Sequence, residues 1–207
     1  MKIAFLFSSK NGMASSLKQR RVEEKREEED PPPDWLAECD SEETILAILK
    51  ALGEKHEVVP IEADEDAYVH LKEAKPDLVF NIAERLDGPS RESHIPTICE
   101  MLEIPYTGSD PLTLGLCLDK SRAKEILGYH KIPTPAFWVV QPGSRIPEEV
   151  GLPAIVKPLY EGSSKGIRDS SVVEDRDELE ARVREIHGLY KQPAIIERFL
   201  CGREFTI

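Results

Sequence analysis

Strand-sized apolar runs alternate with amphipathic helical patterns along the first half of the chain, and this alternation constrains the fold more than any other feature. Strands that alternate with helices form parallel sheets covered by helices. The sequence therefore predicts an α/β fold whose first run is a central parallel strand. The runs are residues 2–8, 56–61 and 77–82, and the helical patterns are residues 40–53, 64–74 and 94–103.

Two local signals refine these elements. Asp40 stands before the first helical pattern with Glu43 three residues later, which predicts a capping box with Asp40 as the cap. Pro60 lies inside the second run and lacks a backbone N–H, so this run is expected at a strand end or a sheet edge.

The second half has a different order of elements. We place a domain boundary near Leu118, which separates a domain of residues 1–118 from one of residues 119–207. An extended Ile-Pro-Thr-Pro joint at residues 132–135 interrupts it. No internal repeat is visible. The expected helices are residues 112–118, 120–129 and 175–190, and the expected strands are residues 137–140, 154–157 and 194–199.

Composition narrows the classes of partner. The 207 residues carry a formal charge of −12, which disfavours nucleic acid and anionic membranes. Residues 11–34 are dominated by Lys, Arg and Glu and are expected to form a solvent-facing excursion. The apolar N-terminal run is too short for a signal peptide or a membrane helix, so the sequence predicts a cytoplasmic protein.

The four cysteines are widely spaced and form no recognisable zinc site. Cys99 and Cys117 stand within apolar helical patterns, so both are expected to be small buried side chains. Cys39 and Cys201 carry no pattern that predicts chemistry.

The strongest chemical signal is a lysine at the end of a predicted buried strand. Lys157 would be costly there unless it meets an anion. The loop that follows contains Gly162, Ser163, Ser164 and Gly166, whose N–H groups and hydroxyls can bind phosphate oxygens. The alternative is a surface turn with an extended lysine. Neither a Walker A motif nor a Gly-x-Gly-x-x-Gly motif is present.

Two glutamates near the end of the sequence, Glu197 and Glu204, are embedded in strand-like apolar stretches. Such carboxylates could accept hydrogen bonds from an adenine amino group or from ribose hydroxyls. The alternative is that both side chains alternate outward into solvent.

Five segments in this order resemble the D-alanine–D-alanine ligase family of ATP-grasp enzymes. The resemblance implies a parallel-sheet pre-ATP-grasp domain over residues 1–118 and the central α+β ATP-grasp subdomain, with the start of the C-terminal lobe, over residues 119–207. The final ATP-grasp lobe would be missing, as in a C-terminally truncated member. The segments are IPYTGSD at 104–110, LDKSRAKEILGYHKIPTP at 118–135, IVKP at 155–158, EGSSKGI at 161–167 and IERFLCGREFTI at 196–207.

The resemblance implies roles at the phosphates. Lys120 would reach the α-phosphate region, and Lys157 would contact phosphate and the adenine side. The segment 161–167 would be the mobile loop that closes over the triphosphate. The loop residues implied at the nucleotide are Glu161, Gly162, Ser163 and Ser164, and the two serines are the implied catalytic donors.

The resemblance also implies an adenosine site. Glu197 would accept from the adenine amino group, and Arg198 and Leu200 would offer main-chain groups to the adenine edge. Glu204 would bind the ribose hydroxyls. The family's chemistry is ATP-dependent ligation of a carboxylate to an amine through an acyl phosphate, which serves peptidoglycan synthesis.

The implied ligands are ATP, Mg²⁺ and an amino acid such as D-alanine, and a homodimer is the implied assembly. The family's metal ligands would lie beyond Ile207, so no metal ligand is assigned. We therefore expect this chain to be inactive by itself.

Three departures from the family pattern concern the substrate. The glycine-rich turn with a substrate-amine glutamate is not visible after the first strand, and residues 81–94 replace the family's His-Gly loop. Glu84, Arg91 and Glu92 are candidate substitutes, with ordinary loop charges as the alternative. Lys165 occupies a loop position that is usually small or apolar and could add a phosphate contact. The first two departures leave open a ligase for another amino acid or peptide, and the missing metal ligands leave open a non-catalytic nucleotide-binding module.

Overall fold

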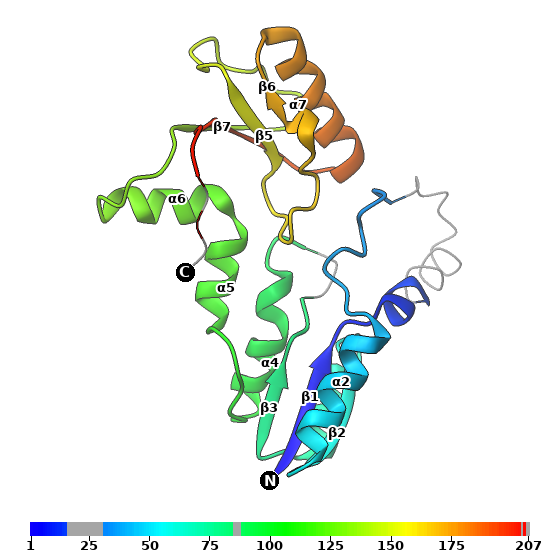
Figure 1. Ribbon diagram of the computed structural model, residues 1–207. Coiled ribbons are helices and arrows are strands. Elements are labelled where there is room, and N and C mark those ends of the chain that lie inside the picture. Colours follow the sequence, from blue (N-terminus) through cyan, green and yellow to red (C-terminus); the bar gives the residue numbers. More distant parts are fainter. Residues whose placement is uncertain (16–30, 85–87, 204, 206–207) are drawn as a thin grey trace. The chain divides into compact units, whose positions relative to one another are not determined.

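The computed structural model describes residues 1–15, 31–84, 88–203 and 205 (Figure 1). These residues divide into two compact units, Met1–Gly115 and Leu116–Ile207. One unit contains a parallel sheet and the other an antiparallel sheet, so the predicted α/β class is confirmed.

The sheet of the first unit has strand order β2-β1-β3. Strand β1 (Lys2–Phe7) is central and pairs in parallel with β2 (Glu57–Glu62) and β3 (Leu78–Asn81), as the sequence predicts. Strand β2 is an edge strand, which confirms the expectation from Pro60. The carboxyl ends of all three strands therefore lie at one edge of this sheet.

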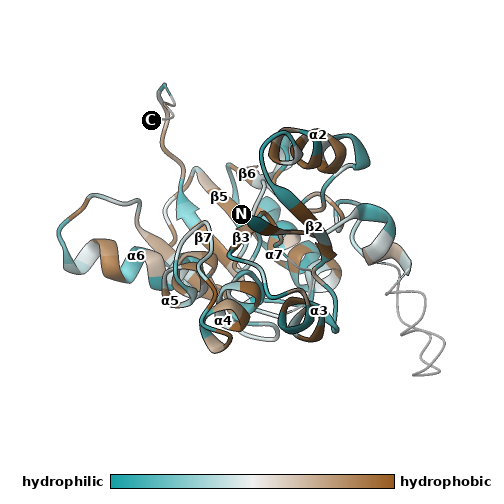
Figure 2. Ribbon diagram, turned by 90° about the horizontal axis from the view of Figure 1, so that it is seen from below, coloured by the Kyte–Doolittle hydropathy of each residue, from teal (hydrophilic) through white to brown (hydrophobic). Residues whose placement is uncertain are grey.

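Helices connect β1 to β2 and β2 to β3, and further helices follow β3. Figure 2 shows hydrophobic and hydrophilic positions side by side along α2, in which Ile45 is buried. The core that results contains Ala4, Leu6, Ile61, Ala63, Ala67, Leu71, Val79, Ala83, Ile95 and Cys99. The helices are α2 (Glu42–Gly53), α3 (Ala67–Ala74), the 3₁₀ turn η1 (Arg91–Ser93), α4 (His94–Met101) and α5 (Pro111–Leu118).

The predicted cap of α2 is wrong by one residue. Ser41 is the N-cap, and its side chain accepts a hydrogen bond from the Thr44 amide. Asp40 instead accepts from the Ser8 amide at 3.2 Å, so it links α2 to the end of β1. Asp and Ser are both favourable N-cap residues. Because the Asp40 side chain bonds to the Ser8 amide, Ser41 caps the helix.

The structure also corrects two burial predictions. Residues 10–15 are helical and Met13 is buried, whereas Asn11 and Ser15 are exposed, so the start of the charged excursion packs through one side chain. Residues 16–30 lie outside the described residues. Cys99 is buried in α4 as predicted, whereas Cys117 in α5 is exposed.

The sheet of the second unit is antiparallel with strand order β4-β7-β5-β6. Helix α7 packs against it through Leu179, Val183 and Ile186, which form one core with Val140, Ala154, Val156, Val173, Ala194 and Ile196. The elements are α6 (Lys120–Tyr129), β4 (Phe137–Val140), β5 (Ala154–Pro158), η2 (Asp169–Ser171), β6 (Val172–Val173), α7 (Arg176–Tyr190) and β7 (Ala194–Arg198).

None of the helices among the described residues combines the length and the apolar character that crossing a bilayer requires.

Candidate functional site

Two predicted site residues meet on one face of the β5–β7 ladder. Ile155 pairs directly with Glu197, and Lys157 stands two residues further along β5 on the same face. This diagonal relationship brings Lys157 Nζ to 3.0 Å from Glu197 Oε2. Glu197 is only 8% exposed, so the alternative in which it points into solvent is wrong. Glu204 lies outside the described residues.

A third residue, Lys124 of α6, completes this cluster. Its ammonium lies 3.5 Å from Glu197 Oε1, and it donates to Thr134 Oγ1 at 2.6 Å and to the Pro135 carbonyl at 3.3 Å. It also lies 5.5 Å from the centre of the Phe137 ring. The buried carboxylate of Glu197 is therefore shared by two lysines.

Sequence reasoning missed Lys124 as a site residue. A lysine on an amphipathic helix is normally solvent-exposed, and this one is 8% exposed. The available signal was its place one helical turn after Lys120, on the same helix face as a predicted nucleotide lysine.

Polar and charged side chains bond to the segment that follows β5. Lys120 Nζ donates to the carbonyls of Leu159, at 3.4 Å, and of Glu161. Lys165 is buried, and its ammonium lies 2.6 Å from Glu161 Oε2. Gln192 Nε2 donates to Glu161 Oε1 at 2.7 Å. In this conformation both carboxylate oxygens of Glu161 are engaged, and Lys165 is directed at Glu161.

The predicted donors Ser163 and Ser164 are exposed at the tip of this loop. Both have left-handed backbone angles, with φ of 45° and 60°. The Lys165 amide donates to the Gly162 carbonyl and the Ile167 amide to the Ser164 carbonyl, which closes two tight turns. These turns present the two serines to solvent, where a phosphate could reach them.

Gly166 is required where the loop passes β5. Its φ is +69°, and an added Cβ would lie 2.4 Å from Pro158 Cγ and 3.1 Å from Tyr190 Cζ. No other residue type fits without moving the loop or the strand.

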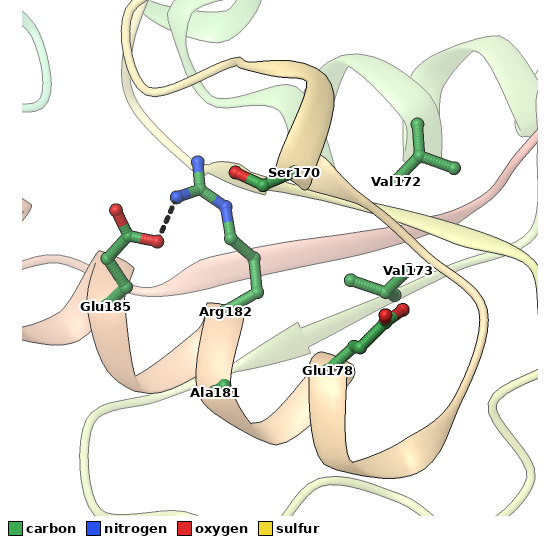
Figure 3. Close-up of a pocket in the computed structure, with 7 residues that line it drawn as sticks. All are labelled: Ser170, Val172, Val173, Glu178, Ala181, Arg182 and Glu185. Atoms are coloured by element: carbon green, nitrogen blue, oxygen red, sulfur yellow. Dashed lines mark hydrogen bonds and ion pairs between the residues drawn. The ribbon is translucent and has the colours of Figure 1, made fainter.

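Arg182 of α7 supports the same loop from the other side. Its guanidinium donates to the Gly166 carbonyl and, at 3.0 Å, to Ser171 Oγ, and it pairs with Glu185. Figure 3 shows Arg182 and Glu185 in a pocket beside β6 and α7. This pocket contains none of the predicted nucleotide residues, and its lining is Ser170, Val172, Val173, Glu178, Ala181, Arg182 and Glu185.

One main-chain donor at the end of β7 is already hydrogen-bonded within the protein. The Arg198 amide donates to the Ala136 carbonyl at 2.9 Å, so this N–H is not open to a ligand in this conformation. Leu200 is exposed and follows the strand. The structure thus brings Lys120, Glu161 and the serine loop together, and separately joins Lys157 to Glu197.

The first unit contains a second cluster of charged side chains. Arg91 Nη2 lies 2.7 Å from both carboxylate oxygens of Glu38, and both residues are buried. Carboxylate oxygens of Glu38, Glu84 and Glu92 lie within 4.8 Å of one another. Burial raises the pKa of Glu84 to about 7, with further contributions from the charges of Glu38 and Glu92. The structure therefore joins the three predicted substitutes and adds Glu38, which sequence reasoning missed.

Magnesium does not fit the carboxylates beside the serine loop. Glu161 is paired with Lys165, and Glu197 is held by two lysines, which disfavours a cation at either position. Among the described residues, Glu38, Glu84 and Glu92 of the first unit bring three carboxylates together, but Arg91 pairs with both oxygens of Glu38, which disfavours a cation there as well.

Comparison with known proteins shows which family the chain resembles. Residues 133–207 match the family model described as "D-ala D-ala ligase C-terminus". A D-alanine–D-alanine ligase of Desulforudis audaxviator is 33% identical over 172 residues, which are 80% of this chain and 54% of that protein. The predicted resemblance to the D-alanine–D-alanine ligase family is confirmed.

Two further similarities extend along most of the chain. The uncharacterized protein y4sG of Sinorhizobium fredii is 32% identical over 173 residues, which are 80% of this chain and 50% of that protein. The crystal structure of a D-alanine–D-alanine ligase from Bacillus anthracis is 25% identical, with a TM-score of 0.66, and the match covers 98% of this chain and 58% of that one. The chain spans about half the length of the curated relatives it matches.

Proposed function

We propose that this chain forms the nucleotide-binding part of an ATP-dependent carboxylate–amine ligase of the D-alanine–D-alanine ligase type. The observation that carries the proposal is the diagonal pair of Lys157 and Glu197, which adjoins a loop rich in glycine and serine. A cation beside a buried acceptor suits a ligand that has both phosphates and an amino-bearing ring. One of the solved relatives is described as complexed with ATP.

The phosphate end of the proposed site is formed by lysines and loop groups. Lys157 would neutralise phosphate charge, while Lys120 stands at the base of the loop and bonds its carbonyls. The hydroxyls of Ser163 and Ser164 would donate to the transferring phosphoryl group. Such groups act by positioning and by electrostatic stabilisation of the transition state.

The adenosine end of the proposed site lies at β7. Glu197 would accept from the adenine amino group, and the segment of Arg198 and Leu200 would pass the ring edge. In our proposal Glu204 binds the ribose hydroxyls. The Arg198 contribution is limited to its carbonyl in this conformation, because its N–H is bonded to Ala136.

The proposed reaction has two steps. A substrate carboxylate oxygen attacks the γ-phosphorus of ATP, the bond to the β,γ-bridging oxygen breaks, and ADP leaves. An amine then attacks the acyl phosphate, a C–N bond forms, and phosphate leaves with loss of a proton from nitrogen. Because the carboxylates beside the loop do not fit a magnesium ion, we assign neither step to a metal here.

The substrate is proposed as an amino acid such as D-alanine, with another amino acid or a peptide as the second candidate. The first unit has a buried Glu38–Arg91 pair with Glu84 and Glu92 beside it, where the family has a different loop. Residues 1–118 are proposed as the pre-ATP-grasp domain and residues 119–207 as the central subdomain. A homodimer in the cytoplasm that does not bind nucleic acid completes the proposal.

Calorimetric titration with ATP tests the proposal. The wild-type chain should bind saturably, and Lys157→Gln should weaken binding by about tenfold or more, because a charge-assisted contact contributes about 1.5–3 kcal/mol. Lys131→Gln removes an exposed lysine and serves as the matched control. Absence of saturable binding, or equal affinities of the Lys157→Gln and control variants, would contradict the proposal.

A further inference from the structure

Glu197 has two cationic partners of unequal character. Lys157 approaches Oε2 at 3.0 Å and Lys124 approaches Oε1 at 3.5 Å. The side chain of Lys157 is 19% exposed, whereas that of Lys124 is 9% exposed. The cluster therefore has one more positive than negative charge, and its more accessible cation is Lys157.

We propose that Lys124 is a positioning residue that neutralises Glu197, so that Lys157 can move from this carboxylate to a nucleotide phosphate. This inference rests on the function proposed above and adds a residue to it. Lys124 itself touches no phosphate in this scheme.

The reason is the cost of leaving a buried charge without a partner. If Lys157 were the sole partner of Glu197, its transfer to phosphate would leave a buried carboxylate uncompensated, which is strongly unfavourable. With Lys124 in place, the transfer leaves one lysine for one carboxylate. The charge excess of the cluster is then matched by the incoming phosphate.

The contacts of Lys124 fix it in this role. Its ammonium is also bonded to Thr134 Oγ1 and the Pro135 carbonyl and faces the Phe137 ring. Phe137 pairs directly with Glu197 in the β4–β7 ladder. Lys124 is thus held by the segment that precedes β4, whereas the ammonium of Lys157 is held by its bond to Glu197 Oε2.

A purely mechanical role is the competing explanation. Lys124 joins α6 to the segment that enters β4, and a loss of that link could weaken the site without involving Glu197. The two explanations differ when the carboxylate is removed by Glu197→Gln. A tether works equally well in that background, while charge compensation no longer has a charge to act on.

A double-mutant cycle separates them. ATP affinity is measured for the wild type, Lys124→Gln, Glu197→Gln and the double variant, with Lys131→Gln as control. We expect Lys124→Gln to weaken ATP binding by about tenfold alone but by less than about threefold beside Glu197→Gln, since residues that act through one another are non-additive. Equal effects in both backgrounds would overturn the proposal.

Folding of the variants is informative in the same cycle. If Lys124→Gln fails to fold and the double variant folds, the loss of folding depends on the charge of Glu197, which supports the proposed pairing of Lys124 with this carboxylate. If neither folds, Lys124 is a structural link and the proposal is wrong.

A second measurement needs no nucleotide. Acylation of Lys157 by acetic anhydride is followed by mass spectrometry in the wild type and in Lys124→Gln. Lys157 should react several-fold more slowly in the variant, because it becomes the sole partner of Glu197. An unchanged or faster rate would overturn the inference, whereas failure of the wild type to bind ATP would count against the proposed function instead.

Discussion

The ammonium of Lys157 on β5 lies 3.0 Å from a carboxylate oxygen of Glu197 on β7, across a diagonal of an antiparallel ladder. Strand pairing alone sets this relationship, since Ile155 is directly opposite Glu197 and Lys157 is two residues further along. The geometry is thus a consequence of sheet register, which burial of the opposite face on α7 maintains.

Replacement of Gly166 by alanine should destabilise the fold. The new Cβ would lie 2.4 Å from Pro158 Cγ at a φ of +69°. Combined strain and overlap should lower the free energy of unfolding by about 2–4 kcal/mol, measured by urea denaturation.

Gly188→Ala is the matched control. Gly188 lies within α7 with open space around its Cα, so alanine should raise the free energy of unfolding by up to about 1 kcal/mol. Equal effects of the two substitutions would refute the account of the loop.

The Glu84→Gln variant should become more stable relative to the wild type as the pH rises. Burial, followed by the charges of Glu38 and Glu92, raises the pKa of Glu84 from 4.5 to about 7 in the folded state. The folded wild type therefore binds an extra proton between these values, and its free energy of unfolding falls as the pH increases through this window.

The difference between wild type and Glu84→Gln should grow from pH 4.5 to pH 7 and reach the order of 1 kcal/mol, since partial exposure screens the effect. Thermal unfolding across this range measures it, with the exposed Glu43→Gln as the control for loss of one glutamate. A difference that grows identically in the control would speak against the carboxylate cluster.

The cysteines should differ sharply in reactivity. Cys117 and Cys201 are exposed, whereas Cys39 and Cys99 are buried. Burial also raises the pKa of the Cys99 thiol to about 11. Alkylation of Cys99 by a maleimide should be at least about a hundredfold slower than that of Cys117, because the thiolate is the reacting form.

Mass spectrometry of the native protein after alkylation measures these rates, and urea-unfolded protein provides the control. All four thiols should react when unfolded. Rapid native labelling of Cys99 would show that α4 does not pack as described.

Local sequence patterns were sufficient for the fold and for part of the site. The parallel sheet follows from apolar runs that alternate with helices, and Lys157 with its loop follows from a lysine at a strand end. These features depend on residues that are adjacent in the chain, which is why the sequence contains them.

The residues that were missed depend on distant partners. Lys124 stands one helical turn after Lys120, but its burial and its pairing with Glu197 are not visible in the sequence. Glu38 is recognised only through Arg91, 53 positions later. Asp40 resembles a helix cap until its bond to the Ser8 amide is seen, and Cys117 resembles a core residue although it is exposed. Pattern alone does not reveal which charged residue is neutralised inside a fold.

The central claim is that ATP binds at the Lys157–Glu197 pair and the serine loop. Amide NMR spectra of the ¹⁵N-labelled chain, recorded with and without ATP, test it most directly. We predict shifts concentrated at residues 157–167 and 195–200, with the amides of β1, β2 and β3 unchanged. Shifts confined to the pocket of Ser170–Glu185, or no shifts at saturating ATP, would contradict the account.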